Sequence, residues 1–110
     1  MKECPHDQLT HGVFSARLQG IFKIRVEGVG EIVAQLAEVR RLPSRPRPGA
    51  SEGSASPDLF ALLFVIPVDR FLPQRTYQFS HESMGQFPLF IVPVGQDGRG
   101  FLYEAVFNRL

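Results

Sequence analysis

The sequence predicts a mainly β fold: a small antiparallel six-stranded sandwich or partly open barrel with one short N-terminal helix. Apolar residues alternate with polar ones in several short segments, and glycines and prolines separate these segments. Ten phenylalanines supply large side chains for a core. With 110 residues, of which 44% are hydrophobic, we expect a single β domain over 1–110, because a second independent core does not fit.

The N-terminal part of the chain predicts the helix and the first strand. Thr10 is a suitable N-cap, and apolar residues over Leu9–Leu18 have the spacing of one helical face: Leu9, Val13, Phe14 and Leu18. From Ile21 to Val26 the apolar spacing changes to two residues, which predicts a half-buried strand.

The segment Glu31–Leu42 has two interpretations. Gly28 and Gly30 precede it in a turn, and its alternating apolar residues then predict the second strand of a hairpin. The alternative is a helix, because the segment is rich in good helix formers and also matches helical spacing.

The middle of the chain contains a predicted loop and a predicted central strand. Residues Pro43–Asp58 are rich in Pro, Ser, Arg and Gly without apolar periodicity, which predicts a flexible internal loop at 43–58. Leu59–Ile66 is apolar on both alternating faces and ends at Pro67, as expected for a strand covered on both sides.

Three further strands are predicted in the C-terminal part: Thr76–Ser80, Gln86–Val94 and Phe101–Asn108. Pro88 and Pro93 lack the amide donor that a central strand needs, so we expect Gln86–Val94 to lie at an edge or to carry bulges near both ends. In the sandwich or barrel, the helix is expected to plug an end.

Composition argues against several function classes. The net charge of +1 is far from the basic balance typical of nucleic-acid binding, and no apolar run has the length of a membrane span. The single Cys4 cannot form an internal disulfide, and no signal peptide is evident. We expect a cytoplasmic protein, or part of an extracellular or phage-like assembly without its own signal peptide.

No catalytic or metal-binding pattern stands out. Cys4, His6 and His11 give at most three metal ligands, whereas structural zinc takes four, so no metal and no cofactor are expected. We expect a protein that is not an enzyme. The alternative is a small-ligand-binding protein or enzyme with a pocket at an open sheet end, lined by Tyr77, His81, Tyr103 and Glu104.

Two groups of residues are candidates for interaction with a partner. Turn hydrophobics, strand prolines and one strand carboxylate form the first group: Phe71, Leu72, Pro88, Pro93 and Glu104. A basic run forms the second group, as a contact for an anionic partner or simply as a solvated linker: Arg40, Arg41, Arg45 and Arg47.

The C-terminal part contains the succession Leu-Pro-Gln, Thr-Tyr, Val-Pro-Val-Gly and Tyr-Glu-Ala-Val-Phe-Asn, beginning at Leu72, Thr76, Val92 and Tyr103. This succession resembles a family of small bacterial proteins of unknown function, with Arg75 standing where that family is expected to have glycine. The resemblance implies an accessory or structural role near phage tail-collar-like proteins, and it implies no catalytic residues.

Together these observations predict a non-catalytic structural or adaptor domain. We expect it to assemble with itself or with a phage-tail-like or fibre protein, through a β edge or a sheet face. A protein partner or a homo-oligomer is expected, whereas a nucleic-acid partner is not.

Overall fold

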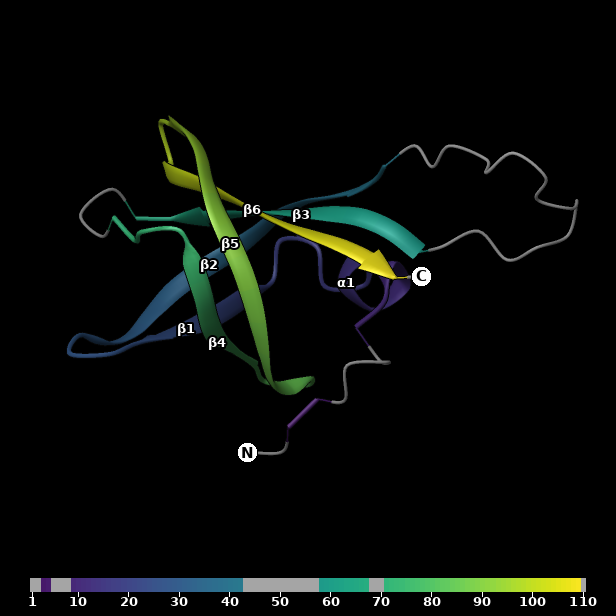
Figure 1. Ribbon diagram of the computed structural model, residues 1–110, viewed down its shortest axis with the longest axis horizontal. Coiled ribbons are helices and arrows are strands. Elements are labelled where there is room, and N and C mark those ends of the chain that lie inside the picture. Colours follow the sequence, from purple (N-terminus) through teal and green to yellow (C-terminus); the bar gives the residue numbers. More distant parts are fainter. Residues whose placement is uncertain (1–2, 5–8, 43–57, 68–70, 110) are drawn as a thin grey trace, which may run out of the picture.

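The strands of the computed structural model follow one another around a closed antiparallel barrel in the order β1-β2-β3-β6-β5-β4 (Figure 1). This confirms the prediction of a mainly β fold with six antiparallel strands and one short helix. The structure describes residues 3–4, 9–42, 58–67 and 71–109. The elements in chain order are α1 (His11–Ser15), β1 (Ile21–Val26), β2 (Gly30–Arg41), β3 (Asp58–Ile66), β4 (Arg75–His81), β5 (Gly85–Asp97) and β6 (Gly100–Arg109).

Helix α1 is shorter than its sequence pattern indicated. The Thr10 side-chain oxygen accepts a hydrogen bond from the Val13 N–H at 3.2 Å, which confirms Thr10 as the N-cap. The helix ends at Ser15, so Leu18 lies beyond it and is 48% exposed. The expectation that Leu18 belongs to the buried helical face was therefore wrong.

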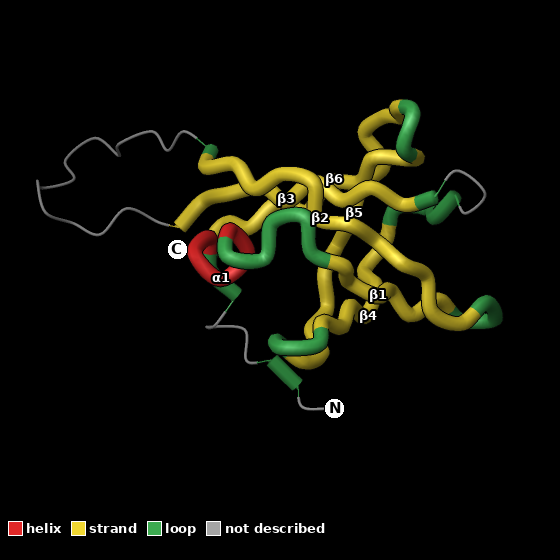
Figure 2. Tube along the Cα trace, turned by 180° about the vertical axis from the view of Figure 1, so that it is seen from behind, coloured by secondary structure: helices red, strands yellow, loops and turns green. Residues whose placement is uncertain are grey.

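Phe14 anchors α1 against the barrel. Its ring is fully buried and contacts the rings of Phe22, Phe60, Phe87 and Phe107, with centroids 5.5 to 6.2 Å apart. These four partners come from β1, β3, β5 and β6. Figure 2 shows the helix beside the C-terminal end of β6. One helical residue thus joins four strands at this end of the barrel.

The segment Gly30–Arg41 is a strand, as the hairpin interpretation predicted. It pairs with β1 over Gly30–Gln35 and with β3 over Gln35–Arg41. A register shift between Leu36 and Glu38 marks a bulge. Pairing with two neighbours outweighs the helix propensity of these residues, which is a weak preference.

Strand β3 pairs with β2 on one side and, along its whole length, with β6 on the other. Its inward side chains, including Phe60, Leu62 and Phe64, are fully buried, whereas Leu63 on the outer side is only partly covered. Asp58 is the first residue of β3 and pairs with Arg109. The predicted loop at 43–58 was therefore wrong at its last residue, which belongs to the strand. Residues 43–57 lie outside the described residues.

The prediction that Gln86–Val94 is an edge strand is wrong. Strand β5 pairs with β4 from Gly85 to Ile91 and with β6 from Val92 to Asp97. A bulge follows Pro93, as expected for one end of the segment. Alongside the first half of β5, the Cys4 N–H donates a hydrogen bond to the Gln86 carbonyl at 2.6 Å. The barrel is closed, so no whole strand remains as a free edge.

The link from β3 to β4 is attached to the barrel through Tyr103. The Tyr103 hydroxyl accepts a hydrogen bond from the Leu72 N–H at 2.6 Å and donates one to the Leu72 carbonyl at 2.9 Å. Both residues are buried. One side chain therefore satisfies two backbone groups that water does not reach.

Replacing Tyr103 with Phe is expected to lower the free energy of unfolding by about 2–3 kcal/mol, because the Leu72 N–H and carbonyl lose their partner while buried. Tyr77→Phe is the matched control, since the Tyr77 hydroxyl makes one bond, to the Pro73 carbonyl at 2.7 Å, in a less buried position. Urea unfolding measures both losses. An equal or smaller loss for Tyr103→Phe would contradict this account of the link.

Gly100 is expected to be irreplaceable at the start of β6. Its φ of 153° is rare for residues with side chains, and a Cβ there would overlap the Ile66 carbonyl oxygen. We expect Gly100→Ala to lower the Tm by more than about 8 °C, which corresponds to about 2 kcal/mol for a chain of this size. Gly98→Ala is the control, because nothing lies within 4 Å of its added Cβ. Thermal unfolding followed by circular dichroism measures the Tm of both variants. Similar Tm values for Gly100→Ala and Gly98→Ala would refute the steric argument.

Candidate functional site

The structure separates the residues predicted for partner contact. Phe71 is 60% exposed and packs edge-on against Phe101, whereas its neighbour Leu72 is 4% exposed and folds back into the core. Pro88 is exposed opposite Gln78 on β4, and Pro93 is half-buried opposite Tyr103 on β6. These residues do not form one continuous surface: Glu104 points outward from β6, Pro88 lies on the outer side of β5, and Leu72 is in the core.

The four residues of the alternative pocket are not brought together. The hydroxyls of Tyr77 and Tyr103 bond to the backbone of Pro73 and Leu72, and burial raises the pKa of both phenols. His81 ends β4 at the opposite end of that strand from Tyr77's partner Pro73. Glu104 points outward from β6. Neither tyrosine therefore offers a free hydroxyl next to His81 or Glu104.

His81 is the last residue of β4, just before the turn into β5, and its ring centroid is 4.6 Å from that of Phe22. Its Nδ1 accepts a hydrogen bond from the Ser83 N–H at 3.0 Å, so in the neutral ring the proton resides on Nε2. The Ser83 hydroxyl lies 3.1 Å from the same nitrogen, and Arg17 Nε donates to that hydroxyl at 3.1 Å. Burial, followed by the Arg17 charge, lowers the pKa of His81. These contacts stabilise the turn and keep the ring neutral.

The lowered pKa of His81 makes stability depend on pH in a defined direction. The unfolded state binds the proton more readily, so the contribution of His81 is complete above about pH 6.5 and is lost as pH falls below it. We expect wild-type protein to lose more stability between pH 7.5 and pH 5 than His81→Phe, which keeps the ring contact but does not titrate. Urea unfolding at the two pH values tests this. Identical losses would contradict it.

The basic run is divided by the strand geometry. Arg40 and Arg41 end β2 opposite Ala61 and Phe60 of β3, on opposite sides of the strand. Arg40 faces outward, where its guanidinium forms an ion pair with Glu104. Arg45 and Arg47 lie outside the described residues. Within the described part of the chain, Arg40 and Arg41 therefore do not form one cationic patch.

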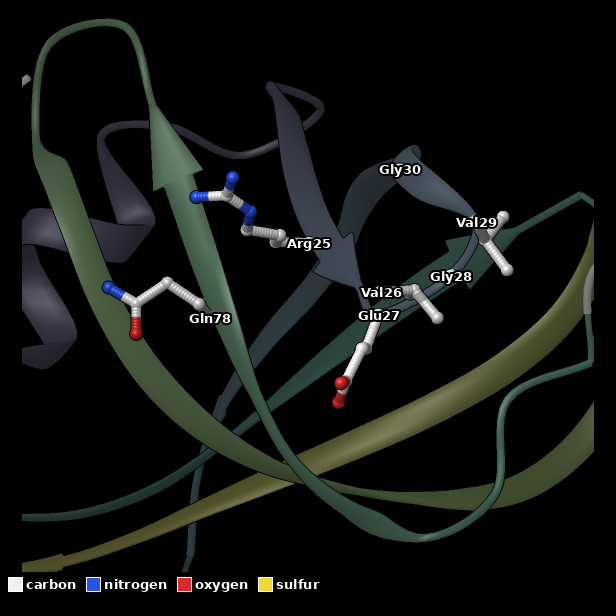
Figure 3. Close-up of a pocket in the computed structure, with 7 residues that line it drawn as sticks. All are labelled: Arg25, Val26, Glu27, Gly28, Val29, Gly30 and Gln78. Atoms are coloured by element: carbon white, nitrogen blue, oxygen red, sulfur yellow. The ribbon is translucent and has the colours of Figure 1, made fainter.

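A shallow open hollow of about 500 Å³ lies between the β1–β2 hairpin and β4 (Figure 3). Its lining consists of Arg25, Gln78 and the hairpin residues 26–30. Figure 3 shows the Arg25 and Glu27 side chains extending in different directions, so this hollow does not present a convergent pair of charged groups. Such an arrangement favours neither acid–base catalysis nor tight enclosure of a small ligand.

An apolar surface covers the outside of β3, β6 and β5. Side chains alternate along each strand, and the outward positions of these three neighbouring strands are nearly all apolar. We call this surface the apolar face, and its members are Ala61, Leu63, Val65, Leu102, Val106, Phe90, Val92 and Val94, with Glu104 as the one charged residue among them.

The apolar face is exposed at several points. Val106 is 54% exposed, and Phe90 and Val94 are each 50% exposed. Leu102 is half-buried, and its side chain lies beside its β5 partner Gly95, whose missing Cβ would lie 3.9 Å from Leu102 Cδ1. β6 is hydrogen-bonded to β3 along its length and to β5 from Val92 to Asp97, so the face is continuous across these paired stretches. Phe90 lies beyond them, where β5 pairs only with β4.

Glu104 lies near the middle of the apolar face, between Leu63 on β3 and Val92 on β5. Its carboxylate Oε2 is 3.6 Å from Nη2 of Arg40. Arg40 belongs to β2 and is paired with Ala61, so its side chain must cross the outer side of β3 to reach Glu104. This crossing accounts for the burial of the small Ala61 side chain, which is only 3% exposed although it points outward.

The sequence contained a signal for the apolar face that the strand assignments did not use. In Leu59–Ile66 and in Phe101–Asn108 both alternating sides carry apolar residues, whereas β1 alternates apolar with charged residues. Two-sided apolar character was interpreted as burial on both sides. In β3 the outward side chains of Ala61 and Val65 are indeed buried and Leu63 is partly covered, whereas on β6 the outward Val106 is 54% exposed.

The described part of the chain contains no group of three or more His, Cys, Asp or Glu residues arranged to hold a metal ion. Among the same residues, no helix is long and apolar enough to cross a membrane.

A family model described as "Domain of unknown function (DUF6916)" matches residues 9–107. This match includes every strand up to the last residues of β6, and it includes all members of the apolar face. No curated protein and no solved structure matches the chain.

Proposed function

The chain belongs to the DUF6916 family, a domain of unknown function, and we propose that it is a non-catalytic structural or adaptor domain that assembles through its apolar face. The observation that carries this proposal is the exposure of three large apolar side chains on the outside of β5 and β6, those of Val106, Phe90 and Val94. Monomeric proteins rarely expose large contiguous apolar patches, whereas the centre of a protein interface is apolar and poor in charge.

The rigidity of the face supports this role. β3 pairs along its length with β6, and β5 continues the sheet on the other side of β6. Beneath these strands lie buried rings, including Phe64, Tyr103 and Phe107. A surface fixed by backbone pairing and by a packed core is pre-organised, so little conformational entropy is lost when a partner binds.

The interior of the barrel argues for assembly over small-molecule chemistry. Aromatic rings in contact occupy the space between the strands: Phe60 stacks on Phe107 with centroids 4.7 Å apart, and Phe64 lies tilted against Phe79 at 5.0 Å. Small barrels are filled by their own side chains in this way. The outer surface is therefore the part of the described chain best suited to recognition.

The sequence resemblance implies an accessory or structural role in a phage-derived or extracellular assembly, and the partner we propose is the same chain or a phage-tail-like or fibre protein. An apolar sheet face suits either partner, because both present extended protein surfaces. Such a domain functions in the cytoplasm or as part of an extracellular or phage-like assembly.

Placing a charge on the face is expected to abolish assembly. Val106→Lys introduces an ammonium group that an apolar interface cannot solvate. We therefore expect the variant to lose self-association, or to lose binding to the partner protein that the wild type retains from native cells. Light scattering of the purified chain and an affinity pull-down from native cells provide the measurements.

Val33→Lys is the matched control for Val106→Lys. Val33 is 48% exposed, close to the 54% of Val106, but it lies on β2, where its cross-strand partner is Lys23 of β1. Urea unfolding checks that both variants fold. The proposal is wrong if Val106→Lys assembles as well as Val33→Lys, or if wild-type protein stays monomeric and retains no protein.

A further inference from the structure

The ion pair between Arg40 and Glu104 on the apolar face is long and without a hydrogen bond within one chain. Arg40 Nη2 and Glu104 Oε2 are 3.6 Å apart, beyond hydrogen-bond distance, and the other contact of Arg40 is Nε to Glu38 Oε1 at 4.0 Å. Arginine and carboxylate groups favour two parallel hydrogen bonds at shorter distance. The side chains of Arg40 and Glu104 remain 60% and 31% exposed. Both groups therefore retain hydrogen-bonding capacity toward a partner.

A partner that covers the apolar face must also satisfy this pair. Covering Glu104, which lies between Leu63 and Val92, removes water from a carboxylate surrounded by apolar side chains. The desolvation penalty is large unless a cation and further hydrogen bonds replace the water. A suitable partner therefore presents an apolar surface, a base that reaches Glu104 and an acid that reaches Arg40.

A second copy of this chain has all three features. In a two-fold symmetric dimer the same patch is used on both subunits, so each contact between two different residues occurs twice. We propose, on the basis of the assembly role above, that the occupant of the apolar face is a second copy related by a two-fold axis. Arg40 of each copy pairs with Glu104 of the other.

The apolar face is the part of the surface that this dimer would bury. A standard specific interface buries roughly 800 Å² on each partner, about a tenth of the surface of a small protein. The accessible surface of the chain is 7136 Å², and the apolar face extends over three of the six strands. Val106, Phe90 and Val94 contribute area that is still exposed in the monomer.

The dimer is tested by exchanging the two charges. Glu104→Arg places two bases on the face and Arg40→Glu places two acids, so each variant alone brings like charges together across the two-fold axis. We expect each to raise the dimer dissociation constant about tenfold or more relative to wild type. A mixture of the two variants restores both cross-pairs, so a heterodimer forms at near wild-type affinity. Sedimentation velocity and native mass spectrometry measure these species.

Two controls separate the interface from the fold. Arg25→Glu changes a charge on β1, away from the face, and should dimerise as wild type does. The double variant Arg40→Glu/Glu104→Arg keeps the pair within each chain. It should dimerise with itself and exclude the wild-type chain. Urea unfolding confirms that each variant is folded.

The outcomes distinguish this inference from the proposed function. Single variants that dimerise as wild type does, or a mixture that forms no heterodimer, overturn the two-fold dimer. If the wild-type chain is a monomer that binds another protein, and the Val106→Lys variant no longer binds it, the two-fold dimer is wrong but the assembly role stands. If the Val106→Lys variant dimerises and binds partner protein as well as the wild type does, both proposals are wrong.

Discussion

The packing of Phe14 between four strands is the interaction on which the rest of the structure depends. The β5–β6 ladder ends at Val92 and Glu104, so the two strands separate toward one end of the barrel. A barrel wall with separating strands exposes core side chains unless something fills the opening. The five-residue helix α1 is too short to be stable alone, so its position rests on the burial of this ring.

Closure of the barrel determines which part of the molecule remains available for recognition. An open sheet presents backbone donors and acceptors at its edges, and these attract other strands. In this barrel each strand has neighbours on both sides over at least part of its length, and Cys4 adds a bond beside the first half of β5. The proposed assembly therefore uses outward side chains rather than backbone edges, and the apolar face holds three of the exposed large hydrophobic residues, Phe90, Val94 and Val106.

Local patterns in the sequence were sufficient to predict most strands, because alternation and turn residues act over a few neighbours. The pairing of β4 and β5 through a short turn is one example. The two prolines predicted that Gln86–Val94 lies at a sheet edge, and this prediction was wrong because it depends on pairing between segments distant in sequence. Pro88 lies where β5 has only β4 as a paired neighbour, so its missing N–H is tolerated inside a closed barrel. Sequence alone does not reveal that the other half of β5 pairs with β6.

The apolar face was beyond local prediction for the same reason. It exists because β6, the last strand, inserts between β3 and β5, a neighbourhood that depends on contacts distant in sequence. The same arrangement changes the meaning of Arg40, which in sequence belongs to a basic run. Strand alternation separates it from Arg41 and directs it across β3 to Glu104. A charge that suggested an anionic partner is thus half of an ion pair on an apolar surface, and in the proposed dimer such a pair contributes to orientation more than to affinity.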